Sequence, residues 1–115
     1  MARVLPFALA VSLLAGCAIS SHPRIADIRH DPGRYQRHSI TVEGVVTSSW
    51  DLPLAPIKLY KVDDGSGEVT VVAHDGRTPP KGSRVSVKGR VSEVAEFGRR
   101  SLGLHLEQEH LRFTR

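Results

Sequence analysis

The sequence has one cysteine, Cys17, one tryptophan, and an aromatic content of only 5%. A lone cysteine excludes an intramolecular disulfide, and no Cys/His spacing typical of a zinc site occurs. The sequence also lacks a glycine-rich phosphate loop, a nucleophile elbow and a Ser-His-Asp context. Its 115 residues suffice for one small domain. We therefore expect a protein that is not an enzyme and that has no cofactor.

Long apolar runs are also scarce, since only the N-terminus has one. Val4–Leu14 follows the basic residue Arg3 and is interrupted by Pro6 and Ser12. The run is too short for a stable transmembrane helix, which needs about 20 apolar residues. A basic start followed by a short apolar run is typical of an export signal. We expect residues 1–16 to be a cleaved signal peptide.

The residues that end this segment, Leu14-Ala15-Gly16-Cys17, resemble the lipoprotein box of bacterial cell-envelope proteins at all four positions. The resemblance implies cleavage before Cys17, a diacylglyceryl thioether on its sulfur, and usually an acyl chain such as palmitate on its new amino group. Two or more acyl chains anchor a protein stably in a membrane. The alternative is an ordinary secreted protein with a chance cysteine near its cleavage point.

In this interpretation, residues 17–23 form a lipidated tether that holds residues 24–115 close to the lipid. The six residues 18–23 that follow the cysteine reach about 20 Å when extended. Ala18 follows the cysteine, where an aspartate usually retains lipoproteins of Gram-negative bacteria in the inner membrane. The resemblance thus implies a location in the cell envelope, at the periplasmic face of the outer membrane if the host is Gram-negative.

A short helix is predicted at residues 24–30, because Ile25 and Ile28 are three apart and would share one face. Ser21 is its expected N-cap. The helix is expected to stop at Asp31-Pro32-Gly33.

Beyond residue 38 the apolar residues repeat with a period of two, which is typical of half-buried strands. Asp64-Gly65-Ser66-Gly67 predicts a tight hairpin turn, because glycine readily adopts positive φ. Leu111 and Phe113 are expected to cover one end of the resulting barrel. Strands are expected from Ser39 to a loop at Trp50–Pro56, and over 57–63, 68–73, 83–92 and 102–107, with Leu102, Leu104 and Leu106 inward in the last.

Five short strands with glycine bends predict an all-β, five-stranded OB-like Greek-key barrel. Three segments are similar to bacterial OB-fold proteins, namely Val42–Val46, Tyr60–Val69 and Lys81–Val91. The helix that usually lies between strands 3 and 4 of this fold has no room in residues 78–83. The single short helix is therefore placed before the first strand. The fold hosts many functions, so the resemblance names no ligand.

The loop Trp50–Pro56 is the first candidate binding site. It places Trp50, Leu52 and Leu54 in a connection that flanks the usual ligand face of an OB-fold. Tryptophan is favoured in interaction hot spots, so these side chains would anchor a ligand or partner. The alternative is that the loop folds back and closes the bottom of the barrel.

A basic surface is the second candidate. Strand alternation places Arg84, Lys88 and Arg90 on one outward face. We expect an envelope protein, a glycan or a lipid surface as the partner, because export removes the protein from cytoplasmic nucleic acid. The alternative is that the basic exterior only keeps the domain soluble. The candidate binding residues are Trp50, Leu52, Leu54, Lys58, Tyr60, Arg90, Arg99 and Arg100.

Two further clusters suggest chemistry. His105, Glu107 and His110 are weak candidates for metal ligands, but a metal ion wants three or four ligands, so a solvated strand edge is the favoured interpretation. Asp63-Asp64 is expected to cap its own turn rather than form an acid site. A distant likeness to a haem chaperone fails, because no tyrosine follows the histidines near the C-terminus.

Taken together, these features predict a membrane-anchored envelope lipoprotein that acts as a non-catalytic OB-fold binding module. The alternatives are a periplasmic carrier of a small ligand, haem or metal, and a surface protein that binds nucleic acid.

Overall fold

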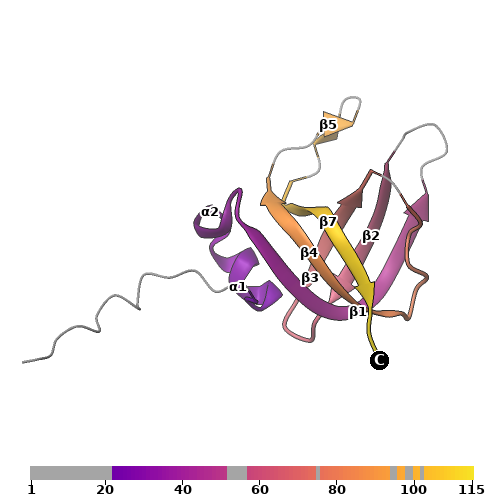
Figure 1. Cartoon of the computed structure of the whole chain (residues 1–115). Coiled ribbons are helices and arrows are strands. Elements are labelled where there is room, and N and C mark those ends of the chain that lie inside the picture. Colours follow the sequence, from indigo (N-terminus) through magenta and orange to yellow (C-terminus); the bar gives the residue numbers. More distant parts are fainter. Residues whose placement is uncertain (1–21, 52–56, 75, 94–95, 98–99, 102) are drawn as a thin grey trace, which may run out of the picture.

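The computed structural model describes residues 22–51, 57–74, 76–93, 96–97, 100–101 and 103–115. Within them, two short helices, α1 (Ile25–His30) and α2 (Pro32–Tyr35), lie at one side of a barrel of strands (Figure 1). None of the helices in these ranges is long and apolar enough to cross a membrane. The barrel consists of β1 (Ser39–Asp51), β2 (Lys58–Asp63), β3 (Glu68–Ala73), β4 (Arg84–Ser92) and β7 (His105–Phe113), and β5 (Glu96–Phe97) and β6 (Arg100–Ser101) form a separate small sheet.

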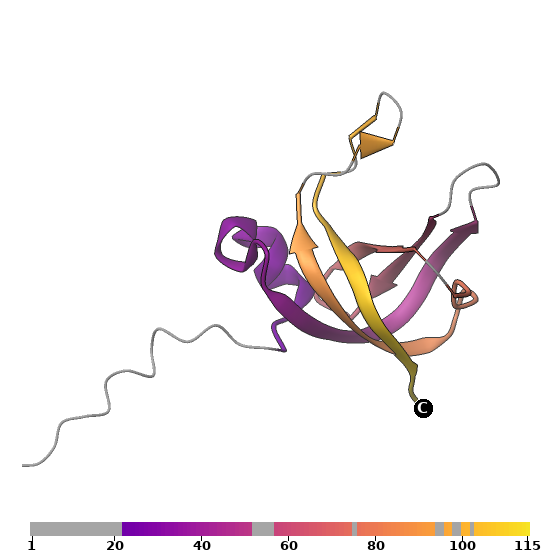
Figure 2. The same ribbon diagram turned by 45° about the horizontal axis from the view of Figure 1, so that its top comes forward.

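The five barrel strands close in the order β1-β2-β3-β7-β4, which confirms the expected OB-like all-β barrel. Neighbouring strands are antiparallel except for β3 and β7, which are parallel. β1 serves both sides of the barrel, because Ser39–Val45 pairs with β4 and Val45–Asp51 pairs with β2. Figure 2 shows how strongly β1 curves as it does so. The register shift between Val46 and Ser48 accompanies this bend, as bulges do in barrels.

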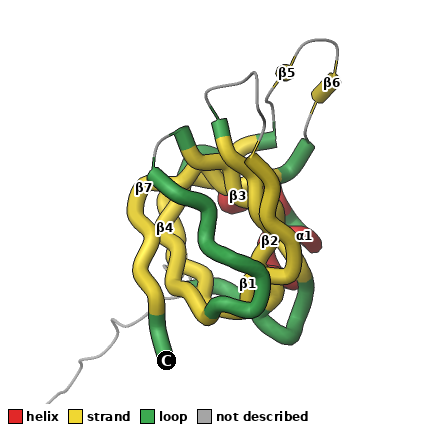
Figure 3. The backbone as a smooth tube through the Cα atoms, turned by 90° about the vertical axis from the view of Figure 1, so that its right-hand side faces the viewer, coloured by secondary structure: helices red, strands yellow, loops and turns green. Residues whose placement is uncertain are grey.

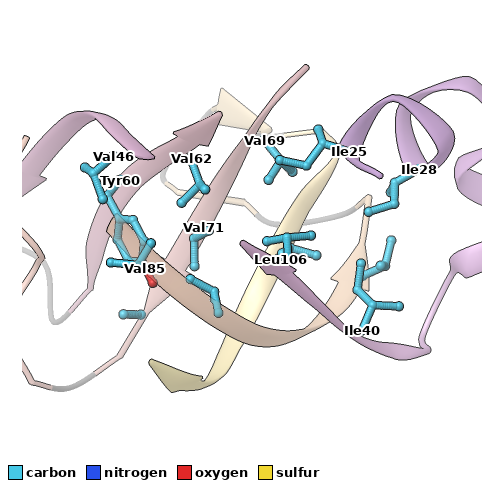
Figure 4. Close-up of a cluster of buried hydrophobic side chains, with 14 of the residues drawn as sticks. Ile25, Ile28, Ile40, Val46, Tyr60, Val62, Val69, Val71, Val85 and Leu106 are labelled. Carbon is cyan, nitrogen blue, oxygen red and sulfur yellow. The ribbon is translucent and has the colours of Figure 1, made fainter. Parts of the chain in front are cut away.

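The hydrophobic core runs along the barrel from the helices to the opposite end (Figure 4). Ile25 and Ile28 of α1 lie at the helix end, whereas Tyr60 and Val85 lie toward the other. Burying a side chain of this size contributes about 1.5–3 kcal/mol relative to leaving it exposed. The predicted helix face and strand alternation are confirmed by the burial of Ile25, Ile28, Ile40, Val42, Val46, Val69, Val71, Val85, Val87 and Val91.

The N-terminal helices differ in detail from the prediction. The N-cap of α1 is Arg24, whose backbone N–H donates to the Asp27 carboxylate at 3.2 Å. The expected N-cap, Ser21, lies outside the described residues. α1 ends at His30 as predicted, but Pro32 also begins α2, so a second helix follows where one was expected. Proline suits the first position of a helix, because its missing N–H needs no partner there.

The last strand is shifted relative to its predicted range of 102–107. It begins at His105 and continues to Phe113. Gly103 has a φ of 78°, a left-handed conformation that interrupts an extended strand. Leu106 is buried as predicted and Leu104 packs against the core, whereas Leu102 lies outside the described residues.

The barrel end away from the helices is covered by the β3–β4 loop, which crosses it in Figure 3. Pro79 in this loop is buried, and the N–H of Gly82 donates to the carbonyl oxygen of Val46 at 2.8 Å. The loop thus takes the position for which Leu111 and Phe113 were predicted. That prediction was wrong for Phe113, which is 59% exposed at the end of β7, whereas Leu111 packs against the core from within the strand.

The β2–β3 turn holds α1 against the barrel. Asp64 Oδ2 accepts the backbone N–H of Ile25 at 2.9 Å, and Ser66 Oγ accepts that of Ala26 at 3.0 Å. Helix N-termini leave such N–H groups unpaired, so the turn supplies the cap from a distant part of the chain. Asp64 Oδ1 also accepts the backbone N–H of Ser66 at 2.8 Å. The prediction that this aspartate caps its own turn is confirmed, and it caps the helix as well.

Replacing Asp64 with alanine is expected to destabilise the fold by about 1–2 kcal/mol, the usual cost of removing a helix cap. Burial alone would raise the pKa of Asp64, but hydrogen bonds from Ser66, Ile25 and Gly67 outweigh it and hold this pKa below its ordinary value of 3.8. The stabilisation is therefore complete above pH 3.8 and is lost as the pH falls through the lower pKa of the folded state. Urea unfolding at several pH values measures both effects.

The matched control is Asp63→Ala. Within the described residues, the Asp63 side chain has one hydrogen bond. Its Oδ1 accepts the backbone N–H of Gly65 at 2.7 Å. Its loss should cost about 0.5–1 kcal/mol. Equal destabilisation by the two substitutions, or unchanged acid unfolding of the Asp64→Ala chain, would contradict the role of Asp64 in holding α1.

Candidate functional site

The outer surface of β1, β2, β3 and β7 presents aligned rows of side chains. Pairing places Trp50 opposite Leu59, Leu59 opposite Val72, and Val72 opposite Glu107. These residues alternate with core residues along their strands, so they point away from the barrel interior, and Val72 is buried there while the others are at least partly exposed. Lys61, Thr70 and His105 form the next row by the same pairing, and His105 is fully buried within it. This surface contains the candidates Trp50 and Glu107.

Trp50 is the exposed aromatic residue of this surface. It lies within β1 rather than in the predicted loop, and it is 43% exposed. The ammonium group of Lys61 lies 5.8 Å from the centre of its ring, within the range of a cation–π interaction. Lys61 Nζ also lies 3.8 Å from Glu68 Oε1. The indole ring is thus positioned by a charged neighbour yet remains open to a partner, while Leu52 and Leu54 lie outside the described residues.

Two of the other candidates on β2 do not share this surface. Tyr60 is fully buried in the barrel, and its hydroxyl donates to Gln108 Oε1. Burial raises the pKa of the Tyr60 hydroxyl well above its ordinary value. Lys58 has the same strand parity as Tyr60, and its Nζ donates to the carbonyl oxygen of Gly76 in the β3–β4 loop at 2.6 Å. The placement of Tyr60 on a binding surface is therefore corrected, and Lys58 is engaged within the fold.

The basic candidates lie elsewhere. Arg90 is exposed on β4, where it is paired with Ser39 and Glu107. Ser39 is the first residue of β1, whereas Trp50 lies near the other end of that 13-residue strand, so Arg90 and Trp50 do not converge on one site. Arg99 lies outside the described residues, and Arg100 is described only as part of the backbone of β6.

Of the predicted cluster of His105, Glu107 and His110, the structure brings His105 and Glu107 together. His105 is fully buried, with Nδ1 donating to the carbonyl oxygen of Gly103 at 2.7 Å and Nε2 lying 3.0 Å from Glu107 Oε1. His74 Nε2 lies 3.2 Å from the other carboxylate oxygen of Glu107. The sequence did not indicate His74, because it follows β3, which pairs with β7 only in the closed barrel.

This cluster is closed by its own hydrogen bonds. Both ring nitrogens of His105 have partners within the chain, so a ligand would have to displace Glu107 or Gly103. His110 lies apart from it, paired with Lys88. Among the described residues, no group of three or more His, Cys, Asp or Glu side chains is placed to hold a metal ion.

Two shallow grooves lie away from Trp50. One of about 660 Å³ runs beside the β2–β3 turn and is lined by residues of both charges, including Glu43, Asp63, Asp64, Arg84 and Arg115. A second, of about 240 Å³, crosses β1, β4 and β7, and its lining includes Lys88, His110 and Arg112. Sequence alternation indicated the cations of β4 but neither groove, since each groove is formed by segments that meet only in the barrel.

The comparisons with known proteins bear on the fold. No protein-family model and no curated protein sequence matches the chain. A putative aspartyl-tRNA synthetase from Leishmania major Friedlin is similar in structure with a TM-score of 0.61 at 12% identity, over 95% of this chain and 23% of that one. For asparaginyl-tRNA synthetase from Pyrococcus horikoshii the TM-score is 0.56 at 18% identity, over 69% and 20% of the two chains.

The barrel also resembles OBody AM2EP06, which was solved bound to hen egg-white lysozyme. Here the TM-score is 0.52 at 22% identity, over 69% of this chain and 82% of the OBody. The chain has an OB-like fold. It spans less than a quarter of the length of either synthetase, and at these identities the likeness shows the fold alone.

Proposed function

We propose that the chain is a membrane-anchored lipoprotein of the cell envelope that acts as a non-catalytic OB-fold binding module. The anchor would be Cys17, as the resemblance of Leu14-Ala15-Gly16-Cys17 to a lipoprotein box implies. The binding surface would be the outer face of β1, β2 and β3 around Trp50, with an envelope protein or a glycan as the partner.

The observation that carries the proposed binding role is the exposure of Trp50. Most large apolar side chains of the described residues lie in the core, whereas Trp50 is 43% exposed on the outer surface. Lys61 places a positive charge beside the ring, and Glu68 places a negative charge beside Lys61. An exposed aromatic ring bordered by polar groups is typical of the centre of an interface, where truncation to alanine costs 2 kcal/mol or more, or about 30-fold in affinity.

Trp50→Ala is therefore expected to reduce recovery of the main partner by at least about tenfold. The measurement is crosslinking in intact cells, followed by purification of the chain and quantitative mass spectrometry. Lys61→Ala should have a smaller effect, about two- to fivefold, because it removes only the cation beside the ring.

Phe113→Ala is the matched control, since Phe113 is also a large exposed apolar side chain, at the end of β7. It should leave recovery of the partner unchanged. If Phe113→Ala lowers recovery as much as Trp50→Ala does, the loss of partner reflects the general hydrophobicity of the surface and not a specific site at Trp50. If neither substitution changes recovery, Trp50 is not a binding residue.

A further inference from the structure

The side of the barrel opposite β2 and β3 is basic. In the closed strand order, β4 lies between β7 and β1, away from the β2–β3 pair. Arg84, Lys88 and Arg90 are exposed along β4, and His110 and Arg112 are exposed on β7. We call these five side chains the basic face.

Strand pairing makes the basic face continuous. His110 is paired with Lys88, and Arg112 is paired with Ser86, midway between Arg84 and Lys88. A strand rises about 3.3 Å per residue, so the cations from Arg84 to Arg90 extend over about 20 Å. This row on β4, widened by His110 and Arg112 on β7, suits an extended charged surface better than a small ligand.

The positive charge of the basic face is little neutralised at Lys88, Arg90 and Arg112, whereas Arg84 lines the groove beside the β2–β3 turn together with Glu43, Asp63 and Asp64. Within the described residues, no ion pair joins Arg84, Lys88, Arg90 or Arg112 to a carboxylate. Glu107 is paired with Arg90 along the strands, but its carboxylate lies against His74 and His105 instead. Glu43 is the acidic residue that lines the groove on this face.

The described chain begins beside this face, a few residues after the proposed anchor. His22, at the start of the described chain, lines the same groove as Lys88, His110 and Arg112. Cys17 precedes His22 by five residues, which reach at most about 17 Å. Acyl chains on Cys17 would therefore enter the membrane within reach of the basic face.

We propose that the basic face docks on anionic phospholipid headgroups of the membrane in which Cys17 is anchored. This inference rests on the proposed function, because the lipid anchor brings the face to the membrane. Each cation near an anionic surface strengthens attachment by about fivefold, and the attraction fades within a Debye length of about 8 Å at physiological salt. Docking on this side would direct Trp50 and the outer face of β2 and β3 away from the lipid.

The test measures which side of the anchored protein faces the lipid. The lipidated chain, residues 17–115, is reconstituted in vesicles that carry a headgroup quencher. A fluorophore is attached to Thr41→Cys or to Thr70→Cys. Thr41 is paired with Lys88, whereas Thr70 lies on the outer side of β3. In vesicles of phosphatidylcholine and phosphatidylglycerol in equal parts, the label at position 41 should be quenched at least about threefold more than the label at position 70. The difference should vanish in phosphatidylcholine alone and at about 1 M salt.

Charge reversal supplies the matched controls. Lys88→Glu combined with Arg112→Glu should abolish the difference between the labels. Arg77→Glu combined with Lys81→Glu makes the same change in net charge at exposed positions of the β3–β4 loop and should preserve it. Equal quenching of the two labels in the anionic vesicles, or an unchanged difference after reversal at Lys88 and Arg112, would overturn the proposal.

The outcomes separate this inference from the proposed function. A chain that carries no acyl group and does not enter the vesicles would refute the anchor. An anchored chain with no preferred side would refute only the docking of the basic face. Binding of a single-stranded oligonucleotide by the same face, with no preference for phosphatidylglycerol, would overturn it in favour of nucleic acid.

Discussion

An exported chain that carries Cys17→Ser is expected to leave the membrane fraction almost completely. The variant needs an ordinary secretory signal in place of residues 1–16, because an uncleaved Val4–Leu14 segment would itself hold the chain at the membrane. Each buried CH₂ of an acyl chain contributes about 0.8 kcal/mol, so the loss of two or more chains should lower the membrane-bound to soluble ratio at least about a hundredfold.

Labelled palmitate and fractionation measure this result. Membranes are washed at about 1 M salt before counting, because the Debye length then falls to about 3 Å and the basic face no longer contributes. The native chain should take up the label and remain with the membranes, whereas the Cys17→Ser chain should do neither. The anchor is refuted if the native chain takes up no label or if both chains sediment alike.

A methyl group on Gly44 is expected to have the largest effect on stability. A Cβ built there would meet the backbone of Asp63 in β2, with the carbonyl carbon 2.7 Å away. Backbone cannot rotate aside as a side chain can, so β1 and β2 would have to separate where β1 passes from one partner strand to the other. Gly44→Ala should cost about 3 kcal/mol or more, which lowers the Tm of a domain of this size by about 12–24 °C.

Gly33→Ala is the matched control for this prediction. Gly33 lies in α2, and a Cβ added there would have no atom within 4 Å. Alanine is also the better helix former, by up to about 1 kcal/mol, so thermal unfolding should be unchanged or slightly raised. A Gly44→Ala chain that unfolds at the same temperature as the native chain would show that the two strands can move apart there at little cost.

Local patterns were sufficient for much of the fold. Val85 and Val87 are buried while Arg84 and Lys88 are exposed, as alternation along β4 predicted. The turn at Asp64-Gly65-Ser66-Gly67 also lies where it was predicted, with Gly65 at a φ of 92°. Side-chain alternation and positive φ are properties of a few consecutive residues, so a sequence shows them without knowledge of the partners.

The candidate binding residues were harder to place. β2 carries large side chains on both of its faces, because Leu59 and Tyr60 are adjacent, so alternation did not show which face was inward. In the closed barrel Tyr60 is buried, whereas Leu59 is partly exposed beside Trp50. Similarly, the spacing of His105 and Glu107 put both on one side of a strand, but the burial of His105 follows from its place in the closed barrel.

The sequence by itself determined the inner and outer sides of most strands and the helix face of Ile25 and Ile28. It also carries the resemblance to a lipoprotein box at Cys17. Only the tertiary structure decided that Asp64 caps α1 from 39 positions along the chain and that Trp50 and the basic face lie on different sides. The physical reason is that these relations depend on how the barrel closes. Closure pairs segments that are far apart in the chain. A local sequence pattern indicates on which side of its strand a residue lies, but it does not indicate which residues are its neighbours across the barrel.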